Sequence, residues 1–317
     1  MNAAPRHSVI VPAYNGQRTI RTTIQSVLAQ TVSDLELIVI DDGSVDATPD
    51  IVAEYTAADT RVQLIRQPNG GTAAARNRGL AAARGTFVSI LDNDDAWLPW
   101  HLERTAAALE VRPNVGLGYA DAWIFNDATG RVNRRTSLSF YPDRAAPDAD
   151  VESFLAALLV KNFIIASSTT MTRTALDLVG GFEAALRGTD DWDMWLRIAM
   201  AGMNACQVDP EPTTILRFSA TSQSSDLAMM VRGNTEVLER VVARLPDGSG
   251  AGALARERLA INAEWLRSLE DPTPGEAIEA ALRRTLGPVK RAALAHRDLV
   301  DPPAAVRAVM QVDVAGI

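Results

Sequence analysis

The order of apolar and polar positions changes regularly along the first 125 residues. Short apolar runs rich in Val and Ile alternate with longer stretches whose apolar positions recur at helical spacing. Apolar runs without in-and-out alternation are typical of strands buried on both faces, and helices between them indicate parallel pairing. The pattern predicts an α/β fold with a mostly parallel central sheet and helices on both faces. The predicted strands are 8–13, 35–40, 62–65 and 86–91, and the predicted helices begin near residues 19, 48, 72 and 99.

The rest of the chain is less regular. A strand is expected over 115–125, a turn over 126–130, and helices over 151–160 and 190–200. After about residue 225 the chain shows three or four helical segments and no convincing strand signal. We therefore divide the chain into an α/β domain, residues 1–225, and a helical C-terminal extension, residues 226–317. The helices expected in the extension are 227–245, 251–269, 274–295 and 302–312.

Composition and charge narrow the class of protein. The chain has 317 residues, 47% of them hydrophobic, so it can bury a core and is not a disordered chain. Its single cysteine, Cys206, excludes a disulfide framework and a zinc site built from cysteines. The net charge of -8 argues against binding a nucleic-acid strand. It does not argue against a nucleotide, because a metal ion can join carboxylates to phosphate.

No targeting or membrane-spanning segment is expected. Residues 1–7 lack the apolar core of a signal peptide, and the most apolar stretch, 154–171, is interrupted by Lys161 and Asn162. We expect a cytoplasmic protein, and peripheral contact with the inner face of the membrane stays open. Residues 289–297 of the extension form either a solvated helix face or a basic helix that lies on anionic lipid. The extension is expected to support homodimer formation, membrane contact or acceptor closure.

Acidic residues follow the predicted strands at their carboxyl ends, where open parallel sheets bind ligands. Asp41 and Asp42 follow the second strand, and Asp92, Asp94 and Asp95 follow the fourth. Carboxylates gathered at one edge are unfavourable without a compensating cation, and oxygen ligands favour Mg²⁺ or Mn²⁺. Each cluster alone also fits an ordinary turn or a helix cap. Their combination at adjacent strand ends predicts a divalent cation site.

Seven stretches in a fixed order carry a family resemblance. Residues 37–46 read Leu-Ile-Val-Ile-Asp-Asp-Gly-Ser-Val-Asp, 91–99 read Leu-Asp-Asn-Asp-Asp-Ala-Trp-Leu-Pro, and 189–197 read Thr-Asp-Asp-Trp-Asp-Met-Trp-Leu-Arg. On these residues the chain resembles the inverting glycosyltransferases of family 2, whose nucleotide-diphospho-sugar transferase fold is called GT-A. The resemblance covers about residues 7–225. The other four stretches are 8–15, 26–31, 69–80 and 180–183.

The resemblance implies a site for a nucleotide and a metal ion. Asp92 and Asp94 match the family's Asp-x-Asp motif, which assigns Asp94 to the metal and Asp92 to the ribose or to metal-bound water, with Asp95 as a weaker candidate. The expected cofactor is a divalent cation, Mn²⁺ or Mg²⁺. The nucleotide-binding residues that the resemblance implies are Pro12, Ala13, Tyr14, Asn15, Asp42, Gly71, Arg76 and Asp92.

The resemblance also implies a general base. The family's base belongs to an acidic pair at a helix start, which assigns Asp191, with Asp190 where Glu is more usual. Both acids also fit the acidic preference of a helix N-terminus. Further candidates near the site are Trp192 as the floor of a sugar pocket, although a buried Trp is usually a core residue, and Asp193, Arg217 and Ser219. Ser219 stands two residues after Arg217, where the family often has His.

The leading hypothesis is therefore a metal-dependent inverting glycosyltransferase. Its expected donor is a nucleotide sugar, a UDP-sugar in the first place, and its acceptor a hydroxyl of a glycan, a lipid-linked molecule or a small molecule. The acceptor loops are expected at 126–150 and 162–172. The alternative is a catalytically silent nucleotide-sugar-binding or scaffold protein of a glycan-assembly complex, against which the intact acidic residues argue. A nucleotidyltransferase is disfavoured because residues 14–18 do not form a Gly-rich basic loop.

Overall fold

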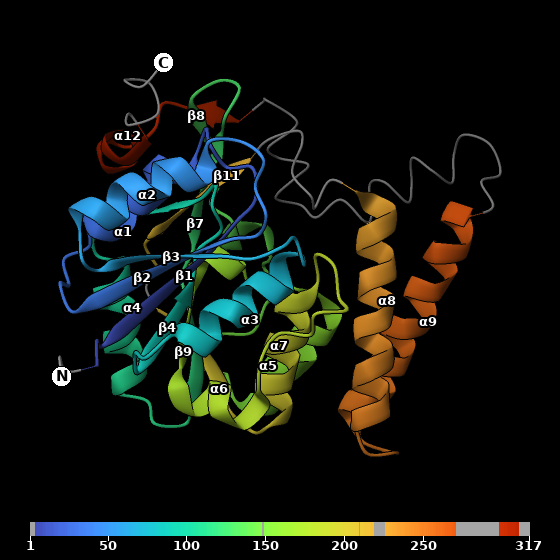
Figure 1. Cartoon of the computed structure of the whole chain (residues 1–317). Helices are drawn as coiled ribbons and strands as arrows, with labels where there is room; N and C mark the ends of the chain where they lie inside the picture. Colours follow the sequence, from blue (N-terminus) through green and yellow to red (C-terminus); the bar gives the residue numbers. More distant parts are fainter. Residues whose placement is uncertain (1–3, 148, 209, 219–225, 271–297, 311–317) are drawn as a thin grey trace.

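A seven-stranded sheet lies at the centre of the molecule (Figure 1). The computed structural model describes the whole chain except residues 1–3, 148, 209, 219–225, 271–297 and 311–317. The strand order is β10-β6-β9-β4-β1-β2-β3, and only β9 runs antiparallel to its neighbours. The predicted mostly parallel sheet is confirmed. Its strands are β1 (His7–Ala13), β2 (Leu35–Asp41), β3 (Val62–Arg66), β4 (Phe87–Ile90), β6 (Val115–Tyr119), β9 (Thr169–Thr172) and β10 (Asn204–Gln207).

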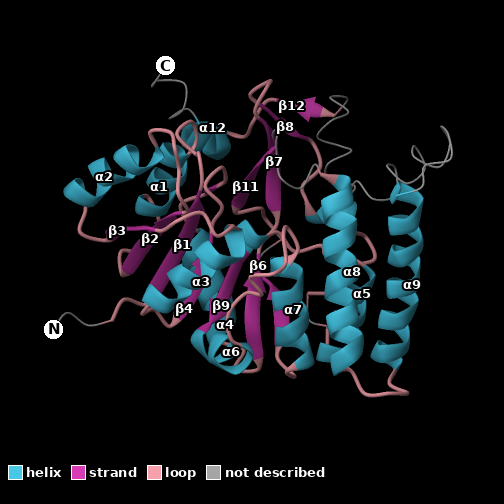
Figure 2. Ribbon diagram, turned by 45° about the vertical axis from the view of Figure 1, so that its right-hand side comes forward, coloured by secondary structure: helices cyan, strands magenta, loops and turns pink. Residues whose placement is uncertain are grey.

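Helices cover both faces of this sheet, as the continuous apolar strands require (Figure 2). Successive residues of β1 point to opposite faces: Val9 and Val11 pack in one apolar cluster with Ile24, whereas Ile10 packs in another with Trp195. Both faces of the strand are therefore core. The helices of this region are α1 (Ile20–Leu28), α2 (Thr48–Ala58), α3 (Thr72–Ala82), α4 (His101–Glu110), α5 (Val151–Val160), α6 (Arg173–Val179) and α7 (Asp190–Met200).

A second sheet of five strands has the order β12-β8-β7-β11-β5. The single strand predicted over 115–125 is wrong, because the chain forms β6, breaks, and continues as β7 in the second sheet. The break falls at Asp121, whose buried carboxylate accepts the N–H groups of Ala122 and Leu138 instead of continuing a ladder. The strands are β5 (Ala96–Trp97), β7 (Ala122–Asn126), β8 (Arg131–Asn133), β11 (Thr214–Phe218) and β12 (Leu299–Val300), and the 3-10 helices are η1 (Leu138–Phe140) and η2 (Ala166–Ser168).

The C-terminal extension begins with two long helices, α8 (Leu227–Arg244) and α9 (Gly250–Glu270), which pack on each other. Figures 1 and 2 both show this hairpin beside α5 and α7. The predicted helix 274–295 and the basic stretch 289–297 lie outside the described residues. In the described part of the chain, no helix combines the length and the apolar character needed to cross a bilayer.

The extension then returns to the second sheet. Strand β12 pairs antiparallel with β8, and α12 (Ala304–Met310) buries Val306 and Met310 against the cluster that holds Phe125 and Val132. The expectation that the extension has no strand is wrong, because β12 is two residues long and its order comes from pairing with β8, which a local pattern does not show. Residues 299–310 thus complete the core of the second sheet.

Candidate active site

The ends of β1, β2 and β4 meet at one edge of the sheet. Ala13 pairs with Asp41 across β1 and β2, and Ile10 pairs with Ile90 across β1 and β4. The loops that follow these strands therefore lie side by side. The Asp42 N–H donates to the Ala13 carbonyl at 2.8 Å, which continues the register one residue beyond the strands.

Asp42 is buried and holds the loop that precedes α3. Its Oδ1 accepts Gln67 Nε2 and the Gly70 N–H, and its Oδ2 accepts the Gly71 N–H, all at 2.8 Å. An ionised carboxylate offers about four acceptor positions, so three internal donors leave one for a ligand. Gly71 has φ +87, and a Cβ there would meet no atom within 4 Å, so the chain is open at the residue where glycine is required.

The residues at the end of β1 and just after it divide into buried and exposed positions. Pro12 and Ala13 are buried in the strand, whereas Tyr14 is 51% exposed at the edge. Asn15 adopts the left-handed conformation at φ 50 and fixes the next loop: its N–H donates to Ser44 Oγ at 3.0 Å, and its Oδ1 accepts the Val45 N–H at 2.9 Å. Of these four predicted nucleotide-binding residues, Tyr14 presents its side chain outward.

Arg76 joins the two acidic motifs. Its Nη2 donates to Asp92 Oδ1 at 2.8 Å and its Nη1 donates to Asp190 Oδ2 at 2.6 Å, and the guanidinium lies 5.4 Å from the ring centroid of Phe182. Arg76 is 4% exposed, and burial alone would lower its pKa. The charges of Asp190 and Asp92 outweigh burial and raise the pKa of Arg76, so the guanidinium stays charged.

Asp191 lies in the first turn of α7, beside this bridge. Burial, and next the charge of Asp190, raise its pKa to about 7. Its Oδ1 accepts the Trp192 N–H at 2.6 Å, and Asn162 Nδ2 donates to its Oδ2 at 3.4 Å. A carboxyl group with a pKa near neutrality suits general-base chemistry. Asn162 carries no motif, but it belongs to the loop 162–172 expected to bind the acceptor.

The acidic loop between β4 and β5 contains the predicted metal ligands. Burial, and next the charge of Asp92, raise the pKa of Asp94 to about 6. Among the described residues, no group of three or more His, Cys, Asp or Glu side chains is arranged to hold a metal ion. Mg²⁺ commonly binds through one or two carboxylates, substrate phosphates and water. Asp94 would fit that mode as a carboxylate ligand, with Asp92 two residues before it.

Asp95 faces the interior. It is buried, accepts Ser167 Oγ–H on one oxygen, and accepts the Arg217 N–H on the other at 2.8 Å. Burial, and next the charge of Asp94, raise the pKa of Asp95 well above its usual range. These contacts give Asp95 a role in holding the loop, whereas Asp94 remains the candidate for the metal, with Asp92 for the ribose or metal-bound water.

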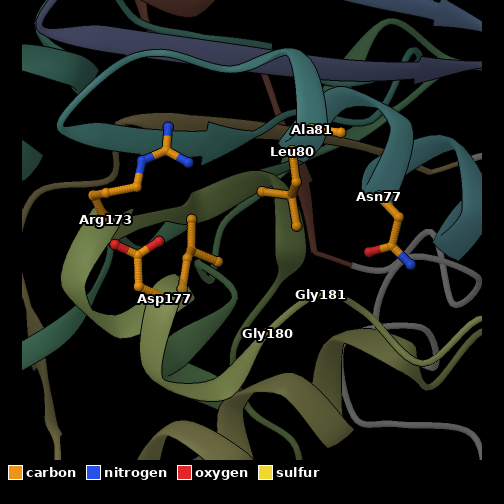
Figure 3. A pocket seen from close by; sticks show the side chains of 8 residues that line it. Asn77, Leu80, Ala81, Arg173, Asp177, Gly180 and Gly181 are labelled. Atoms are coloured by element: carbon orange, nitrogen blue, oxygen red, sulfur yellow. The ribbon is translucent and has the colours of Figure 1, made fainter.

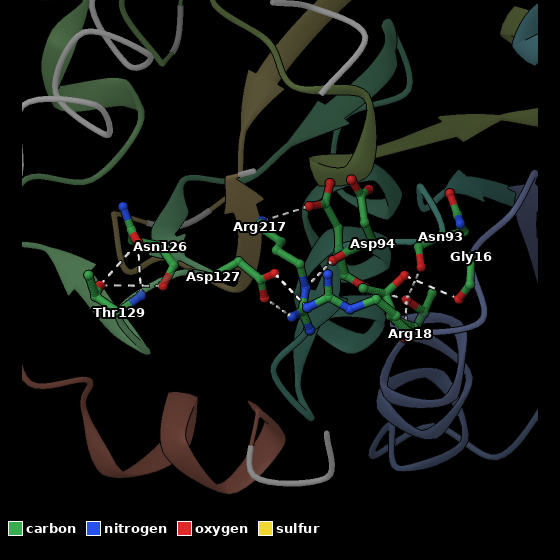
Figure 4. Close-up of polar contacts among 11 residues, drawn as sticks. Gly16, Arg18, Asn93, Asp94, Asn126, Asp127, Thr129 and Arg217 are labelled. Carbon is green, nitrogen blue, oxygen red and sulfur yellow. Dashed lines mark hydrogen bonds and ion pairs between the residues drawn. The ribbon is translucent and has the colours of Figure 1, made fainter. Parts of the chain in front are cut away.

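Arg217 lies on β11 beside the acidic loop (Figure 4). Its Nε donates to the Asp94 carbonyl at 2.9 Å and its Nη1 donates to Asp127, which also lies 3.5 Å from Nη2 of the exposed Arg18. Asp127 follows β7, in the turn predicted over 126–130, and belongs to none of the motifs. Its only sequence signal is an acid after a predicted strand. Ser219 lies outside the described residues.

The remaining candidates in α7, Trp192 and Asp193, have buried side chains that make structural contacts. Trp192 is 5% exposed and its Nε1 donates to the Leu158 carbonyl at 2.9 Å, so it packs in the core rather than offering its ring to a sugar. Asp193 accepts Arg197 Nε at 2.7 Å, and the same guanidinium donates to the carbonyls of Val179 and Gly181. Asp193 therefore holds the loop before Phe182.

A cavity of about 310 Å³ lies away from the acidic residues, between α3 and α6 (Figure 3). Arg173 and Asp177 line it, together with Asn77. Asn77 links it to the site: Asn77 Nδ2 donates to the Phe182 carbonyl and Asn77 Oδ1 accepts the Phe182 N–H, both at 2.7 Å. The cavity is therefore linked through Asn77 to Phe182, whose ring lies against the guanidinium of Arg76.

A family model and several known proteins match part of the chain. Residues 8–155 match the model of glycosyl transferase family 2. The putative glycosyltransferase EpsH of Bacillus subtilis is 45% identical over 94 residues, which are 30% of this chain and 27% of EpsH. The hyaluronan synthase of Pasteurella multocida is 28% identical over 209 residues, 64% of this chain and 19% of the synthase. The chain thus spans about a quarter or less of the length of these relatives.

Solved structures match over nearly the whole chain. S. aureus TarS 1–349, in complex with UDP-GlcNAc, has a TM-score of 0.65 and 20% identity, over 98% of this chain and 83% of that one. The mannosyltransferase PcManGT of Pyrobaculum calidifontis, in complex with GDP-Man and Mn²⁺, has a TM-score of 0.62 and 20% identity, over 98% of this chain and 88% of that one. At this identity the likeness confirms the predicted GT-A fold.

Proposed function

We propose that the chain transfers a sugar from a nucleoside-diphosphate sugar to an acceptor hydroxyl, with inversion at the anomeric carbon, because residues 8–155 match the model of glycosyl transferase family 2. The observation that carries this proposal is the Arg76 bridge. It ties Asp92 of the acidic loop to Asp190, next to Asp191. A leaving-group site and a basic carboxylate are thereby held within one connected network.

In this proposal Asp94 would hold the divalent cation, and Asp92 would contact the ribose or metal-bound water. A bound cation supplies Lewis-acid neutralisation of the charge that develops on the leaving nucleoside diphosphate. Asp42 and Gly71 receive the nucleoside, through the acceptor position left on Asp42 and the open backbone at Gly71. Tyr14, half exposed at the same edge, contacts the base or ribose. PcManGT binds GDP-Man with Mn²⁺ and TarS binds UDP-GlcNAc, which supports this class of donor.

Asp191 acts as the general base. It takes the proton of the acceptor hydroxyl while that oxygen forms the new bond to the anomeric carbon, and the bond from that carbon to the diphosphate oxygen breaks on the opposite face. A pKa of about 7 makes Asp191 a stronger base than an ordinary carboxylate while a large part of it stays ionised near neutral pH. Asp190 is engaged with Arg76 at 2.6 Å. Because Asp190 is bound to Arg76, Asp191 is the member of the pair that can accept the proton.

The acceptor is a hydroxyl of a glycan, a lipid-linked molecule or a small molecule, and UDP-sugars are the first donors to test. Each of the two loops expected to bind the acceptor has one residue at the site. Asn162, in the loop 162–172, contacts Asp191, and Asp127, in the loop 126–150, contacts Arg217. They are the described residues from which acceptor recognition would begin.

The test is turnover of a panel of UDP- and GDP-sugars with Mn²⁺, in wild type and in Asp191→Asn. We expect the substitution to reduce kcat by about 10²–10⁴-fold, because it removes the base and leaves nucleotide binding in place. The matched control is Asp177→Asn, an exposed acid at the remote cavity, which should retain wild-type turnover.

Full activity of Asp191→Asn would disprove the assignment of the base. Nucleotide binding by wild type without turnover of any donor, with a broad set of acceptors, would instead favour a silent nucleotide-sugar-binding or scaffold protein.

A further inference from the structure

The backbone of the acidic loop is held from three separate elements. From α1, Thr23 Oγ1 lies 2.8 Å from the Asp95 carbonyl and 3.0 Å from the Asn93 carbonyl. From β11, Arg217 Nε donates to the Asp94 carbonyl at 2.9 Å. From η2, Ser167 Oγ accepts the Asp92 N–H at 3.1 Å. The carbonyl and amide groups of the loop are therefore engaged inward, while Asp92 and Asp94 keep partly exposed side chains.

Ser167 makes more of these contacts than a local turn requires. It is fully buried, and its hydroxyl both accepts the Asp92 N–H and donates to Asp95 Oδ2. A serine hydroxyl offers one donor and two acceptor positions, so these two bonds use it in both directions. The Ser167 carbonyl also accepts Trp97 Nε1 at 2.6 Å. One residue thus contacts the loop at its first residue, at its last residue and in the strand that follows.

Asp95 links Ser167 to Arg217 on β11. Its Oδ1 accepts the Arg217 N–H at 2.8 Å while its Oδ2 accepts Ser167. The side chain that donates to the Asp94 carbonyl belongs to the same Arg217. Ser167, Asp95 and Arg217 are therefore joined by a continuous chain of hydrogen bonds that ends at the Asp94 carbonyl.

We propose that Ser167 is a positioning residue for the divalent cation: its buried hydroxyl fixes the spacing of Asp92 and Asp94 through Asp92 N–H and Asp95. This inference rests on the proposed function. Ser167 touches neither nucleotide nor metal in this role, and it acts by holding the loop whose two partly exposed acids do. Removal of a residue that holds the metal ligands in place, without binding the metal itself, commonly weakens metal binding by about 10–100-fold.

The chain supplies a matched control in the next residue. Ser168 is also fully buried in η2, but its hydroxyl donates only to the Ile165 carbonyl at 2.8 Å, within its own turn. Ser168→Ala removes the same atom from the same 3-10 helix without touching the acidic loop. Any general effect of a lost buried hydroxyl should appear equally in both variants.

The experiment measures Mn²⁺ binding by electron paramagnetic resonance in the full chain, with UDP or GDP, whichever raises the melting temperature of wild type. We expect Ser167→Ala to weaken Mn²⁺ binding at least tenfold, and Ser168→Ala to bind within about twofold of wild type. Ser167→Cys keeps the volume and replaces a strong hydrogen-bonding group with a weak one, so its affinity should fall between those of Ser167→Ala and wild type. If Ser167→Ala does not fold, Ser167→Cys alone decides the outcome.

Equal Mn²⁺ affinity in Ser167→Ala and Ser168→Ala, or wild-type affinity in Ser167→Cys when Ser167→Ala does not fold, would overturn the positioning role and leave the proposed function intact. Absence of nucleotide-dependent Mn²⁺ binding in wild type would overturn the proposed function itself. The two failures are therefore distinguished by the wild-type measurement.

Discussion

Arg76 is a buried cation between two carboxylates, and removing it should destabilise the fold. Arg76→Met leaves Asp190 and Asp92 without their shared partner, in a place where the side chain of Asp190 is almost fully buried. Loss of one member of a buried ion pair typically costs about 3–5 kcal/mol. We expect the free energy of unfolding at pH 7 to fall by about that amount in chemical denaturation. Arg76→Lys keeps the charge but cannot bind two carboxylates with the planar geometry of a guanidinium. Its free energy of unfolding should therefore fall by less than that of Arg76→Met. A stability of Arg76→Met equal to wild type would rule out this role.

The raised pKa of Asp191 predicts opposite pH effects on activity and on stability. The base form is populated above a pKa of about 7, so kcat should rise with pH through that value. In the unfolded chain the carboxyl titrates near about 4, so between these two values the folded state binds more protons and stability falls as pH rises. Asp191→Asn should therefore unfold at a higher denaturant concentration than wild type above pH 7. A pH–rate profile and denaturation at several pH values check both parts; a stability difference that does not change with pH would contradict the assignment.

At the scale of elements, Asn77 couples α3 to the loop that supports Arg76. Asn77→Ala leaves both the N–H and the carbonyl of Phe182 without their 2.7 Å partners, and each unsatisfied buried group costs about 1–3 kcal/mol. We expect a lower melting temperature and a lower kcat, because the Phe182 ring lies under the guanidinium of Arg76. Asn77→Asp keeps the oxygen that accepts the Phe182 N–H, so its melting temperature and kcat should lie between those of Asn77→Ala and wild type. Wild-type melting and turnover in Asn77→Ala would show that the loop is held without it.

The elements that the sequence predicts well are those whose order is local. Strands β1 and β2 stand out as apolar runs, and α1 and α7 as periodic stretches, because burial of a face leaves its period in the chain. Strands β5 and β12 have two residues each and exist through pairing with distant partners. Their order depends on contacts that no window of sequence contains.

The same distinction holds for the site. Asp42, Asp92 and Asp94 follow predicted strands, so the edge they share could be inferred from the pattern. The Arg76–Asp190 bond joins residues 114 positions apart, and Ser167 reaches its partners through the packing of η2 on the loop. Neither has a local signal, and the family resemblance gave Arg76 as a nucleotide-binding residue without showing that it bridges the two acids.

At the scale of the whole molecule, the last described helix completes the second sheet. Val306 is fully buried against the cluster of Phe125 and Val132, so Val306→Asp would bury an unpaired charge. We expect α12 to undock, seen as faster proteolysis and a lower melting temperature. The matched control is Ala308→Asp on the exposed face of the same helix, which should resemble wild type. Equal proteolysis of the two variants would show that docking of α12 contributes little.

The central claim is that Asp94 and a divalent cation together make a nucleotide-diphosphate site at the edge of the sheet. The most direct measurement is calorimetric titration of UDP, and of GDP in parallel, into wild type and Asp94→Asn, each with Mn²⁺ and with EDTA. The account predicts binding to wild type with Mn²⁺, and a loss of at least tenfold in affinity with EDTA or in Asp94→Asn. Equal affinity under all four conditions would contradict it.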